Sequence, residues 1–353
     1  MKATILKHYQ TYPQAQLLDL FKFIHQSEFG PAHLITDPKA NFTRLQQEYH
    51  QLDPAVKDNV IDVLQPQLCR LHLQVLNQST LALVTLQRFF ELSATPKGSV
   101  AGYYEKIAVL KSLCRDGLLP FPEDAVEQFE AQIKAAPLAA FSHSEAYRLA
   151  YAPAYRVVES RFCEFLSLFA RLDELLQKQE FVVVALDGDC AAGKTTLAKM
   201  LSEVYDGNVI HMDHFFLQPQ QRTEARLQMA GGNLDYERFE GEVLGYLKTG
   251  KSFSYQPFNC QTQAFEAPIV LPVKKLTIVE GSYSHHPKLA QAYDLKVFLS
   301  IEQTLQLERI LKRNGPVMYE KFKHVWIPLE AKYEQAFQIR QNSHLVFESK
   351  RVD

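Results

Sequence analysis

The chain has 353 residues, of which 46% are hydrophobic and 22% are charged, and its formal net charge at pH 7 is −2. This balance is typical of a folded globular protein with room for two domains of ordinary size, and it excludes the disordered and fibrous classes. Because the net charge is close to zero, the whole protein has no electrostatic attraction to nucleic acid, and we expect its charged partner to be a small molecule.

The N-terminal sequence Met-Lys-Ala-Thr-Ile-Leu-Lys-His-Tyr lacks the apolar core and the small-residue cleavage site of a secretory signal. No stretch of the chain has the apolar length that crosses a bilayer. We therefore expect a cytoplasmic protein without a membrane partner, and the sequence leaves its oligomeric state open.

From residue 14 to about residue 176 apolar side chains recur at spacings of three and four, for example at Leu17, Phe21 and Ile24, which indicates helices. Proline-containing breaks at 36–38, 53–54, 95–98 and 119–122 divide this half into about seven helices, of which the last and longest is expected over 154–176. We predict an all-α N-terminal domain over residues 1–177, of unknown role.

Two segments of this half are unusually polar. Residues 25–33 contain His25, Glu28 and His33, but Gly-Pro at 30–31 breaks the helix and makes a metal site a poor interpretation. Residues 141–156 are rich in Tyr, Arg and His, a composition that suits the recognition of an anion or a ring by guanidinium groups and aromatic faces. We predict that Arg148 and Arg156 help to select the substrate, although a polar interface between the two halves is an equally good interpretation.

After the polar residues 177–180 the pattern changes to short apolar runs at 181–187, 208–212, 276–280 and 295–300, separated by helical patterns. This alternation predicts a parallel sheet flanked by helices, that is, an α/β domain over residues 178–353.

The first apolar run leads directly into a Gly-x-x-x-x-Gly-Lys-Thr phosphate-binding loop, or P-loop. The loop residues are Gly188, Asp189, Cys190, Ala191, Ala192, Gly193, Lys194, Thr195 and Thr196. Such a loop curls its backbone N–H groups around phosphate oxygens, its lysine reaches the outer phosphates, its threonine binds Mg²⁺, and the helix that follows points its positive end at the anion. A buried strand before the loop and a helix after it are the context that the motif requires, so we predict nucleotide binding.

The cysteines are five in number, lie far apart in the sequence and include no Cys-x-x-Cys pair, so we expect free and mostly buried thiols. They are Cys69, Cys114, Cys163, Cys190 and Cys260. Cys190 lies in the P-loop at a helix N-terminus, where we expect its pKa to be lowered.

A carboxylate follows the second apolar run, where Asp213 comes directly after residues 208–212. The carboxyl ends of parallel strands face the ligand in open α/β sheets. Asp213 is therefore a candidate to accept the proton of an attacking hydroxyl or to hold Mg²⁺, and the alternative is a helix N-cap.

Six motifs of residues 181–353, in their order and spacing, resemble those of the uridine kinase, phosphoribulokinase and pantothenate kinase group of P-loop kinases. They are the P-loop, Met-Asp-His-Phe-Phe at 212–216, Gly-Asn-Leu-Asp-Tyr-Glu-Arg-Phe at 232–239, Val-Glu-Gly at 279–281, Tyr-Asp-Leu-Lys-Val-Phe at 293–298 and Arg-Ile-Leu-Lys-Arg at 309–313. The resemblance implies a kinase that uses ATP and Mg²⁺ to phosphorylate a hydroxyl of a small metabolite.

The same resemblance implies roles for individual residues on the donor side. Lys194 and Asp213 correspond to catalytic residues, and Glu280 corresponds to the carboxylate near Mg²⁺, together with Thr195 and Asp213. Arg309 and Arg313 are similar to lid arginines that close over the phosphates, with a solvated helix face as the alternative.

On the acceptor side, Asp235 is similar to the acid that binds sugar hydroxyls in uridine kinases, and Tyr283 is a further candidate substrate contact. Capping or surface positions are alternatives for both Asp235 and Glu280. The residues around 236–239 and 255–260 depart from the uridine kinase pattern, so uridine is one possible acceptor among others. The chain's single tryptophan, Trp326, lies in a Pro-x-Glu-x-x-x-Tyr-containing segment and is interpreted as a packing anchor or a base-stacking residue.

The main prediction is a small-molecule kinase domain behind a helical domain. The competing prediction is a regulatory ATP-binding protein or ATPase, whose helical domain recognises a partner or a metabolite.

Overall fold

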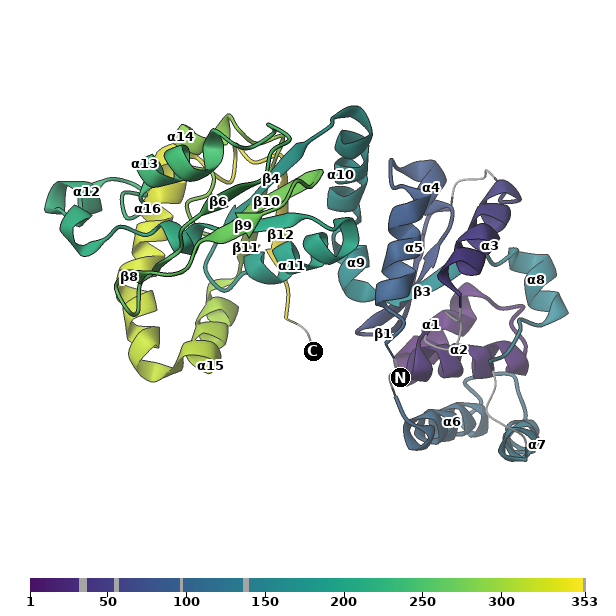
Figure 1. Ribbon diagram of the computed structural model, residues 1–353. Helices are drawn as coiled ribbons and strands as arrows, with labels where there is room; N and C mark the ends of the chain where they lie inside the picture. Colours follow the sequence, from purple (N-terminus) through teal and green to yellow (C-terminus); the bar gives the residue numbers. More distant parts are fainter. Residues whose placement is uncertain (32–36, 54–56, 96–97, 136–139, 352–353) are drawn as a thin grey trace. The chain divides into compact units, whose positions relative to one another are not determined.

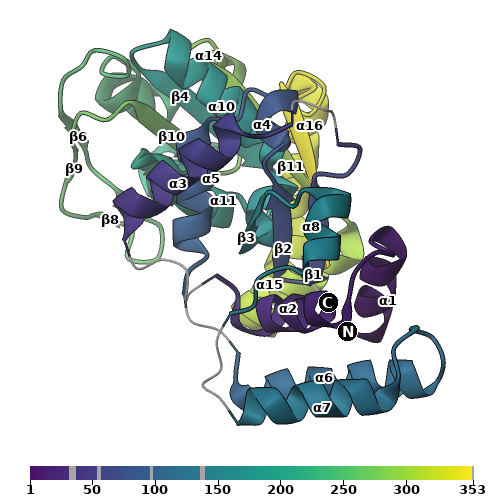
Figure 2. The ribbon, with the colours of Figure 1, turned by 90° about the vertical axis from the view of Figure 1, so that its right-hand side faces the viewer.

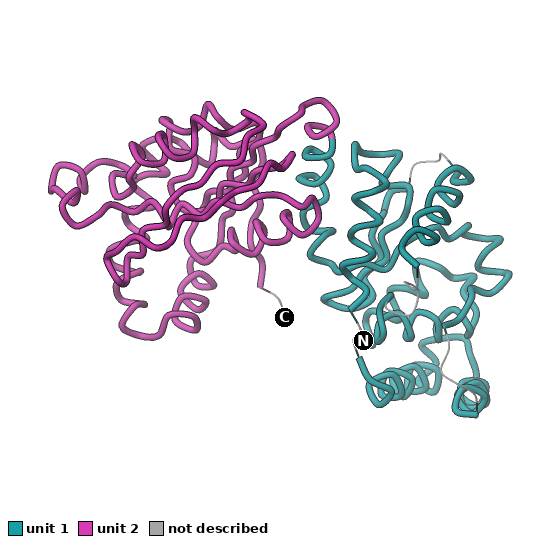
Figure 3. The backbone as a smooth tube through the Cα atoms, in the orientation of Figure 1, with its two compact units in different colours: residues 1–173 teal, residues 174–353 magenta. Residues whose placement is uncertain are grey.

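The computed structural model describes residues 1–31, 37–53, 57–95, 98–135 and 140–351. The chain forms two compact units, residues 1–173 and residues 174–353 (Figure 3). Among the residues discussed above, His33 and parts of the breaks at 36–38, 53–54 and 95–98 lie outside the described residues.

Unit 1 consists mainly of helices, as the sequence predicts, and also contains three strands (Figure 1). Its elements are α1 (Lys2–Thr11), α2 (Leu17–Phe29), α3 (Pro38–His50), β1 (Ile61–Gln65), β2 (Leu68–His72), α4 (Val75–Gln78), α5 (Leu83–Leu92), α6 (Val100–Arg115), α7 (Glu123–Lys134), α8 (Glu145–Tyr151), β3 (Tyr155–Glu159), α9 (Ser160–Glu164) and α10 (Leu166–Lys178), which continues into unit 2.

The three strands form an antiparallel sheet in the order β1-β2-β3, which the sequence analysis did not predict. The helix expected over 154–176 is therefore wrong in its first part, where β3 pairs with β2 and places Arg156 opposite Leu71. Strand β2 is buried at every position, so it lacks the alternation that reveals a half-exposed strand. Its pairing with β3 also joins segments far apart in the chain. The local spacing of apolar residues cannot predict such a contact.

The core of unit 1 lies between helix α2, the sheet and helix α6. Leu20, Phe21 and Ile24 of α2 meet Tyr103 and Ile107 of α6, and all five side chains are fully buried. Figure 2 shows α6 and α7 side by side.

Unit 2 is an α/β domain built on a parallel sheet. Its elements are β4 (Val182–Gly188), α11 (Lys194–Tyr205), β5 (Asn208–His211), η2 (Met212–Phe215), η3 (Pro219–Gln221), α12 (Glu224–Gln228), α13 (Tyr236–Phe239), η4 (Glu240–Leu244), β6 (Phe253–Tyr255), β7 (Phe258–Asn259), β8 (Ala264–Phe265), β9 (Ile269–Leu271), β10 (Leu276–Glu280), α14 (Pro287–Ala290), β11 (Leu295–Ile301), α15 (Gln303–Lys321), η5 (Phe322–Trp326), α16 (Ile327–Phe337) and β12 (Leu345–Ser349).

The main sheet of unit 2 has five parallel strands in the order β12-β11-β4-β10-β5, which confirms the predicted parallel sheet flanked by helices. Strands β4 and β10 are buried at every position, as expected for strands covered on both faces. Helix α11 packs on one face, and α13 and α14 lie on the other (Figure 1). In the part of the chain that the structure describes, no helix has both the length and the apolar character needed to cross a bilayer.

Gly188 ends β4 at a point where the backbone of the neighbouring strand comes very close. It pairs with Leu299 of β11, and a Cβ atom on Gly188 would lie 2.0 Å from the Leu299 carbonyl oxygen. Its φ of +135° is also a conformation that favours glycine. Gly193, the second P-loop glycine, has a φ of +103° but open space where a Cβ would point. The two glycines are therefore required for different reasons.

This difference predicts that Gly188→Ala destabilises unit 2 more than Gly193→Ala does. Gly193→Ala carries only the backbone strain of a positive φ, about 1–2 kcal/mol, whereas Gly188→Ala must also push β4 and β11 apart. Urea unfolding followed by tryptophan fluorescence measures unit 2 alone, because the single tryptophan, Trp326, lies in η5 and packs edge-on against Phe322 at 4.4 Å. Equal losses of unfolding free energy in the two variants would contradict the close approach as the cause.

Candidate active site

The P-loop joins β4 to α11 as a closed turn held by its own lysine. The Lys194 Nζ donates hydrogen bonds to the carbonyl oxygens of Gly188, at 2.7 Å, and Asp189, at 3.0 Å. Gly188, Ala191 and Gly193 all have positive φ values, which turn the loop backbone around a concave centre. Helix α11 begins at Lys194, so its first N–H groups and its positive dipole end face this loop. The geometry is that of an anion-binding loop.

A buried carboxylate anchors the loop from behind. Asp187, the residue before Gly188, is 2% exposed and accepts hydrogen bonds from the backbone N–H groups of Gly188, Tyr283 and His285. It also accepts one from the Tyr333 hydroxyl of α16, at 2.8 Å. One side chain therefore fixes the P-loop, the turn after β10 and the C-terminal helix relative to one another.

The predicted magnesium ligands lie together at the carboxyl end of β10. The Thr195 hydroxyl lies 3.2 and 3.3 Å from the two carboxylate oxygens of Glu280. His211, which ends the neighbouring strand β5 in register with Glu280, contacts the same carboxylate through its Nδ1 at 2.5 Å. This hydrogen bond raises the pKa of His211 and so favours the imidazolium form.

His211 is a site residue that the sequence analysis missed. Its signal is its place at the end of a parallel strand, directly before Met212 and Asp213, where side chains face the ligand edge.

These groups fit a magnesium ion that is brought with a nucleotide. Mg²⁺ in phosphoryl-transfer sites is held by one or two protein ligands together with phosphate oxygens and water. Thr195 and Glu280 supply one hydroxyl and one carboxylate at hydrogen-bonding distance from each other. Among the described residues no group of three or more His, Cys, Asp and Glu side chains forms a metal cluster. The donor set therefore suits a shared site with phosphate better than a cage made of protein alone.

Asp213 lies in the short helix η2, and its side chain is exposed. It does not occupy the N-cap of this helix, which is His211, so the capping alternative does not apply to η2. Enclosure by the surrounding protein and the negative charge of Glu280 raise the pKa of Asp213, while Lys194 and Arg313 oppose the shift. Asp213 therefore shares one electrostatic environment with Lys194 and Glu280.

The two lid candidates have different surroundings in α15. Arg309 donates to the Ala191 carbonyl of the P-loop at 3.1 Å and to the Ser349 hydroxyl at 2.7 Å, so it ties α15 to the loop. Arg313 is exposed, bonds to the adjacent Asn314 and lies 5.9 Å from the Phe322 ring centroid. Arg309 thus contacts the P-loop. Arg313 fits the alternative interpretation, a residue on a solvated helix face.

On the acceptor side, Asp235 is buried at the N-cap of α13. It accepts hydrogen bonds from the Arg238 backbone N–H, at 3.1 Å, and from the Gln221 side chain, at 2.8 Å. Tyr283 is also buried, with its ring 4.9 Å from that of Tyr333. Asp235 therefore fits the alternative interpretation of a helix-capping residue. Contact of Asp235 or Tyr283 with a substrate stays a prediction.

The arginines predicted for the N-terminal half lie in unit 1. Arg148 is exposed on α8, and Arg156 of β3 forms an ion pair with Glu48 at 2.6 Å. Their contact with a substrate likewise stays a prediction.

Glu330 of α16 is the most informative residue that the sequence analysis did not select. Its Oε2 accepts a hydrogen bond from the Cys190 N–H of the P-loop at 3.0 Å, and its Oε1 accepts one from the Ser282 hydroxyl at 2.6 Å. Burial raises the pKa of Glu330, although the charge of Lys194 opposes the shift. Its signal in the sequence is the Pro-x-Glu-x-x-x-Tyr pattern, in which Glu330 and Tyr333 both contact the P-loop region.

The expectation of a lowered pKa for Cys190 is wrong. The side chain is only 8% exposed, and burial followed by the charge of Glu330 raises the pKa of its thiol. The favourable end of α11 does not offset these two effects, because burial disfavours the thiolate and the carboxylate repels it. The five cysteines are free, and the thiols of Cys69 and Cys163 in unit 1 lie 3.0 Å apart.

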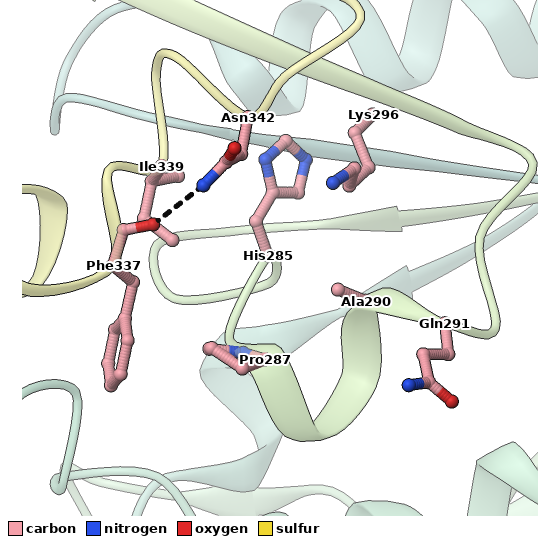
Figure 4. Close-up of a pocket in the computed structure, with 8 residues that line it drawn as sticks. All are labelled: His285, Pro287, Ala290, Gln291, Lys296, Phe337, Ile339 and Asn342. Atoms are coloured by element: carbon pink, nitrogen blue, oxygen red, sulfur yellow. Dashed lines mark hydrogen bonds between the residues drawn. The ribbon is translucent and has the colours of Figure 1, made fainter.

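A pocket of about 300 Å³ lies in unit 2 but away from these groups (Figure 4). It is lined by His285, Pro287, Ala290, Gln291, Lys296, Phe337, Ile339 and Asn342. These residues belong to α14 and the positions that flank it, to β11, and to the end of α16 with the segment after it, so we place no reacting group in this pocket.

Comparison with known proteins finds relatives of a segment of the chain. No family model matches the chain. Over 148 residues, or 39% of its length, the chain is 26% identical to uridine-cytidine kinase-like 1 of Mus musculus, and it spans 27% of that relative. The resemblance to uridine kinase-like proteins is confirmed for this segment.

Solved structures resemble about half of the chain, more distantly. A possible uridine kinase from Bacillus stearothermophilus aligns with 51% of this chain and 99% of its own length, at 18% identity and a TM-score of 0.37. A shikimate kinase from Bacteroides thetaiotaomicron aligns with 49% of this chain and 88% of its own, at 14% identity and a TM-score of 0.25. We draw nothing on substrate from likenesses of this size.

The contact of Glu330 with the P-loop predicts that Glu330→Gln binds ATP more tightly. The amide keeps the size and an acceptor oxygen for the Cys190 N–H but removes a negative charge from beside the triphosphate, a change worth about tenfold in the dissociation constant. Isothermal titration calorimetry with ATP measures the effect. Glu334→Gln, one helical turn further along α16, is the matched control and should leave ATP affinity unchanged. Unchanged or weaker ATP binding by Glu330→Gln would contradict a repulsive role for this carboxylate.

Proposed function

We propose that the protein is an ATP-dependent phosphotransferase that phosphorylates a hydroxyl of a small metabolite. A nucleoside such as uridine is one acceptor that the resemblance supports. The observation that carries the proposal is the convergence of three neighbouring strand ends: the P-loop after β4, Glu280 at the end of β10, and His211 at the end of β5 with Asp213 two residues later. A phosphate loop, a metal carboxylate and a candidate base are the parts that phosphoryl transfer to a hydroxyl requires.

The donor side is assigned to the P-loop and its nearest neighbours. The backbone N–H groups from Gly193 onward and the Lys194 ammonium bind the phosphate oxygens of ATP. Thr195 and Glu280 hold Mg²⁺, which when bound neutralises part of the phosphate charge. The imidazole of His211 keeps the Glu280 carboxylate oriented through its 2.5 Å contact.

The acceptor side is assigned to Asp213. This carboxylate accepts the proton of the attacking hydroxyl, while Arg309 of α15, which contacts the P-loop, stabilises the charge of the transferring phosphoryl group. Because the protein makes no covalent bond to the phosphoryl group in this scheme, the rate gain comes from alignment and charge stabilisation.

A regulatory ATP-binding protein or ATPase is the second candidate function. The observation in its favour is Asp235, whose carboxylate is occupied by the N-cap of α13 and by Gln221 rather than open to an acceptor. This candidate requires nucleotide binding but no carboxylate that activates an acceptor.

The proposal predicts that two substitutions separate binding from chemistry. Lys194→Ala should weaken both ATP binding and turnover, because the lysine contacts the phosphates throughout. Asp213→Asn should keep ATP affinity and lose turnover by about 10²-fold or more, the scale of general-base loss. The measurements are ATP titration and steady-state kinetics with the identified acceptor. Full turnover in Asp213→Asn would move the base to another residue, with Glu280, whose charge acts on Asp213, as the first alternative.

A pH dependence follows from the same carboxylate. Asp213 accepts a proton only when ionised, and its pKa is raised. We therefore expect turnover to fall with decreasing pH from a point above the ordinary aspartate range, and this acidic limb should be absent from the residual activity of Asp213→Asn. A limb of unchanged position in the variant would assign it to another group.

The experiment that tests the function is a phosphoryl-transfer screen over nucleosides, vitamins and sugars, with ATP and GTP as donors and Mg²⁺ present. A phosphorylated product that depends on Lys194 and Asp213 supports the kinase. Slow ATP hydrolysis with no product in the screen, unaffected by Asp213→Asn and Asp235→Ala, supports the regulatory candidate.

A further inference from the structure

Unit 1 contains a fully buried arginine whose guanidinium group is only partly paired. Arg70, in the middle strand β2, is 0% exposed, and its Nε donates to the Gln26 side-chain oxygen at 2.9 Å. Its Nη1 and Nη2 have no hydrogen-bond partner among the residues that the structure describes. Buried donors without partners are rare and cost free energy, and a buried charge costs more unless an opposite charge pairs with it.

Aromatic rings surround the guanidinium but do not replace an anion. The Arg70 Cζ lies 4.7 Å from the Tyr155 ring centroid and 5.4 Å from that of Phe23. The Phe23 ring also stacks on the imidazole of His8, at 4.3 Å, and the His8 Nε2 is likewise buried without a partner among the described residues. Cation–π contact offsets part of the cost of burying the charge, but it leaves the Nη1 and Nη2 donors of Arg70 and the Nε2 atom of His8 without hydrogen bonds among the described residues.

The two carboxylates in this region are already occupied by other donors. Asp62 accepts from His72 at 2.8 Å and from the Tyr12 hydroxyl at 2.6 Å. Burial alone would raise the pKa of Asp62, but the hydrogen bond from His72 and the other contacts lower it to about 2, so the group stays ionised.

Asp19 is held in the same way. It accepts from His143 at 2.8 Å and from both the N–H and the hydroxyl of Ser144. These hydrogen bonds outweigh burial and lower the pKa of Asp19 to about 2. Neither carboxylate forms an ion pair with Arg70, although both contribute to the local charge.

The cluster as a whole therefore carries too little negative charge. Burial and the charge of Arg70 lower the pKa of Lys22 to about 8, and burial also lowers the pKa of Lys57. Arg70, Lys22 and Lys57 are three cations near the two carboxylates, Asp19 and Asp62. Lys22 and Lys57 are partly exposed, so they connect the cluster with solvent.

We propose that unit 1 binds a small oxyanion at Arg70. The two η nitrogens donate in parallel to a carboxylate or phosphate group of a metabolite, and the unpartnered His8 Nε2 supplies a further contact in the tautomer that carries a proton there. A guanidinium fork fits both groups in the same way, so the shared chemistry is a planar pair of acceptor oxygens. The site lies in a unit to which the phosphotransferase proposal assigns no reacting group, and it stands independently of that proposal.

The polar segment 141–156, which the sequence analysis selected, contributes side chains to this cluster. His143 and Tyr155 come from residues 141–156, whose Tyr, Arg and His content suits anion recognition, and their side chains contact each other at 2.6 Å beside Asp19. Tyr155 in turn stacks under Arg70. The arginine that this segment contacts, through the Tyr155 ring, is Arg70 of β2. The sequence analysis did not select Arg70.

The test uses the full chain in the Lys194→Ala background, so that the weakened P-loop contributes little to phosphate binding. Thermal unfolding and isothermal titration calorimetry are measured with inorganic phosphate and with acetate, each against chloride at equal ionic strength. We expect one or both oxyanions to raise the unfolding temperature of unit 1 in a saturable way. The more effective anion distinguishes a phosphate ligand from a carboxylate ligand. No saturable effect of either anion beyond chloride would overturn the proposal.

Variants at Arg70 and a matched surface arginine locate the effect. Arg70→Met should reduce oxyanion affinity by about tenfold or more, the scale of a lost charge-assisted pair, and should not lower stability in chloride, because it removes an unpaired buried charge. Arg115→Met removes an exposed arginine of unit 1 and should bind like its parent. If Arg70→Met does not fold, His8→Phe, which keeps the stack on Phe23, should still weaken binding. Binding that is unchanged in every folded variant of Arg70 and His8 would also overturn the proposal.

Discussion

The carboxylate of Asp187 is the constraint on which the candidate active site depends. It lies at the end of the central strand β4 and is occupied on all sides, by the P-loop through Gly188, by the turn after β10 through Tyr283 and His285, and by α16 through Tyr333. Three segments that are distant in sequence are thus held by one buried charge. The P-loop and Glu280 keep their relative positions because the strand that precedes the loop and the turn that follows Glu280 are bonded to the same two oxygen atoms.

Around this anchor, charges of both signs surround the P-loop. Lys194 and the start of α11 attract a triphosphate, whereas Glu330, Glu280 and Asp213 repel it. Glu280 has an imidazole in direct contact, that of His211 at 2.5 Å, and this contact raises the pKa of His211. Desolvation by the surrounding protein atoms raises the pKa values of Asp213 and Glu330, and the charge of Lys194 opposes both shifts. Nucleotide binding is therefore coupled to the protonation or displacement of carboxylates, as well as to the fit of phosphate to the loop.

The sequence predicts the parts of this protein whose determinants are local. A β-branched run followed by a glycine-rich loop and a helix defines β4, the P-loop and α11, and carboxylates at the ends of short apolar runs locate Glu280 and Asp213. It fails where a contact joins distant segments. The strand β2 is buried on both faces and pairs with β3, more than eighty residues away, so neither strand shows in the local pattern. For the same reason the sequence does not single out Glu330 or Arg70. Glu330 reaches the P-loop only in the folded chain, and only the fold buries the Arg70 guanidinium with its two η nitrogens unpaired among the described residues.

The burial of Cys190 affects how the protein responds to chemical labelling. A cysteine within a P-loop is an obvious target for covalent inhibitors. The thiol of Cys190, however, is buried, accepts a hydrogen bond from the Gln306 amide at 3.3 Å and lies near the carboxylate of Glu330. It stays neutral, and electrophiles that require a thiolate react with it slowly. Cys260, by contrast, is exposed in the connection between β7 and β8. A fluorophore or spin label attached through a thiol therefore reaches this outer hairpin first and leaves the phosphate loop chemically untouched.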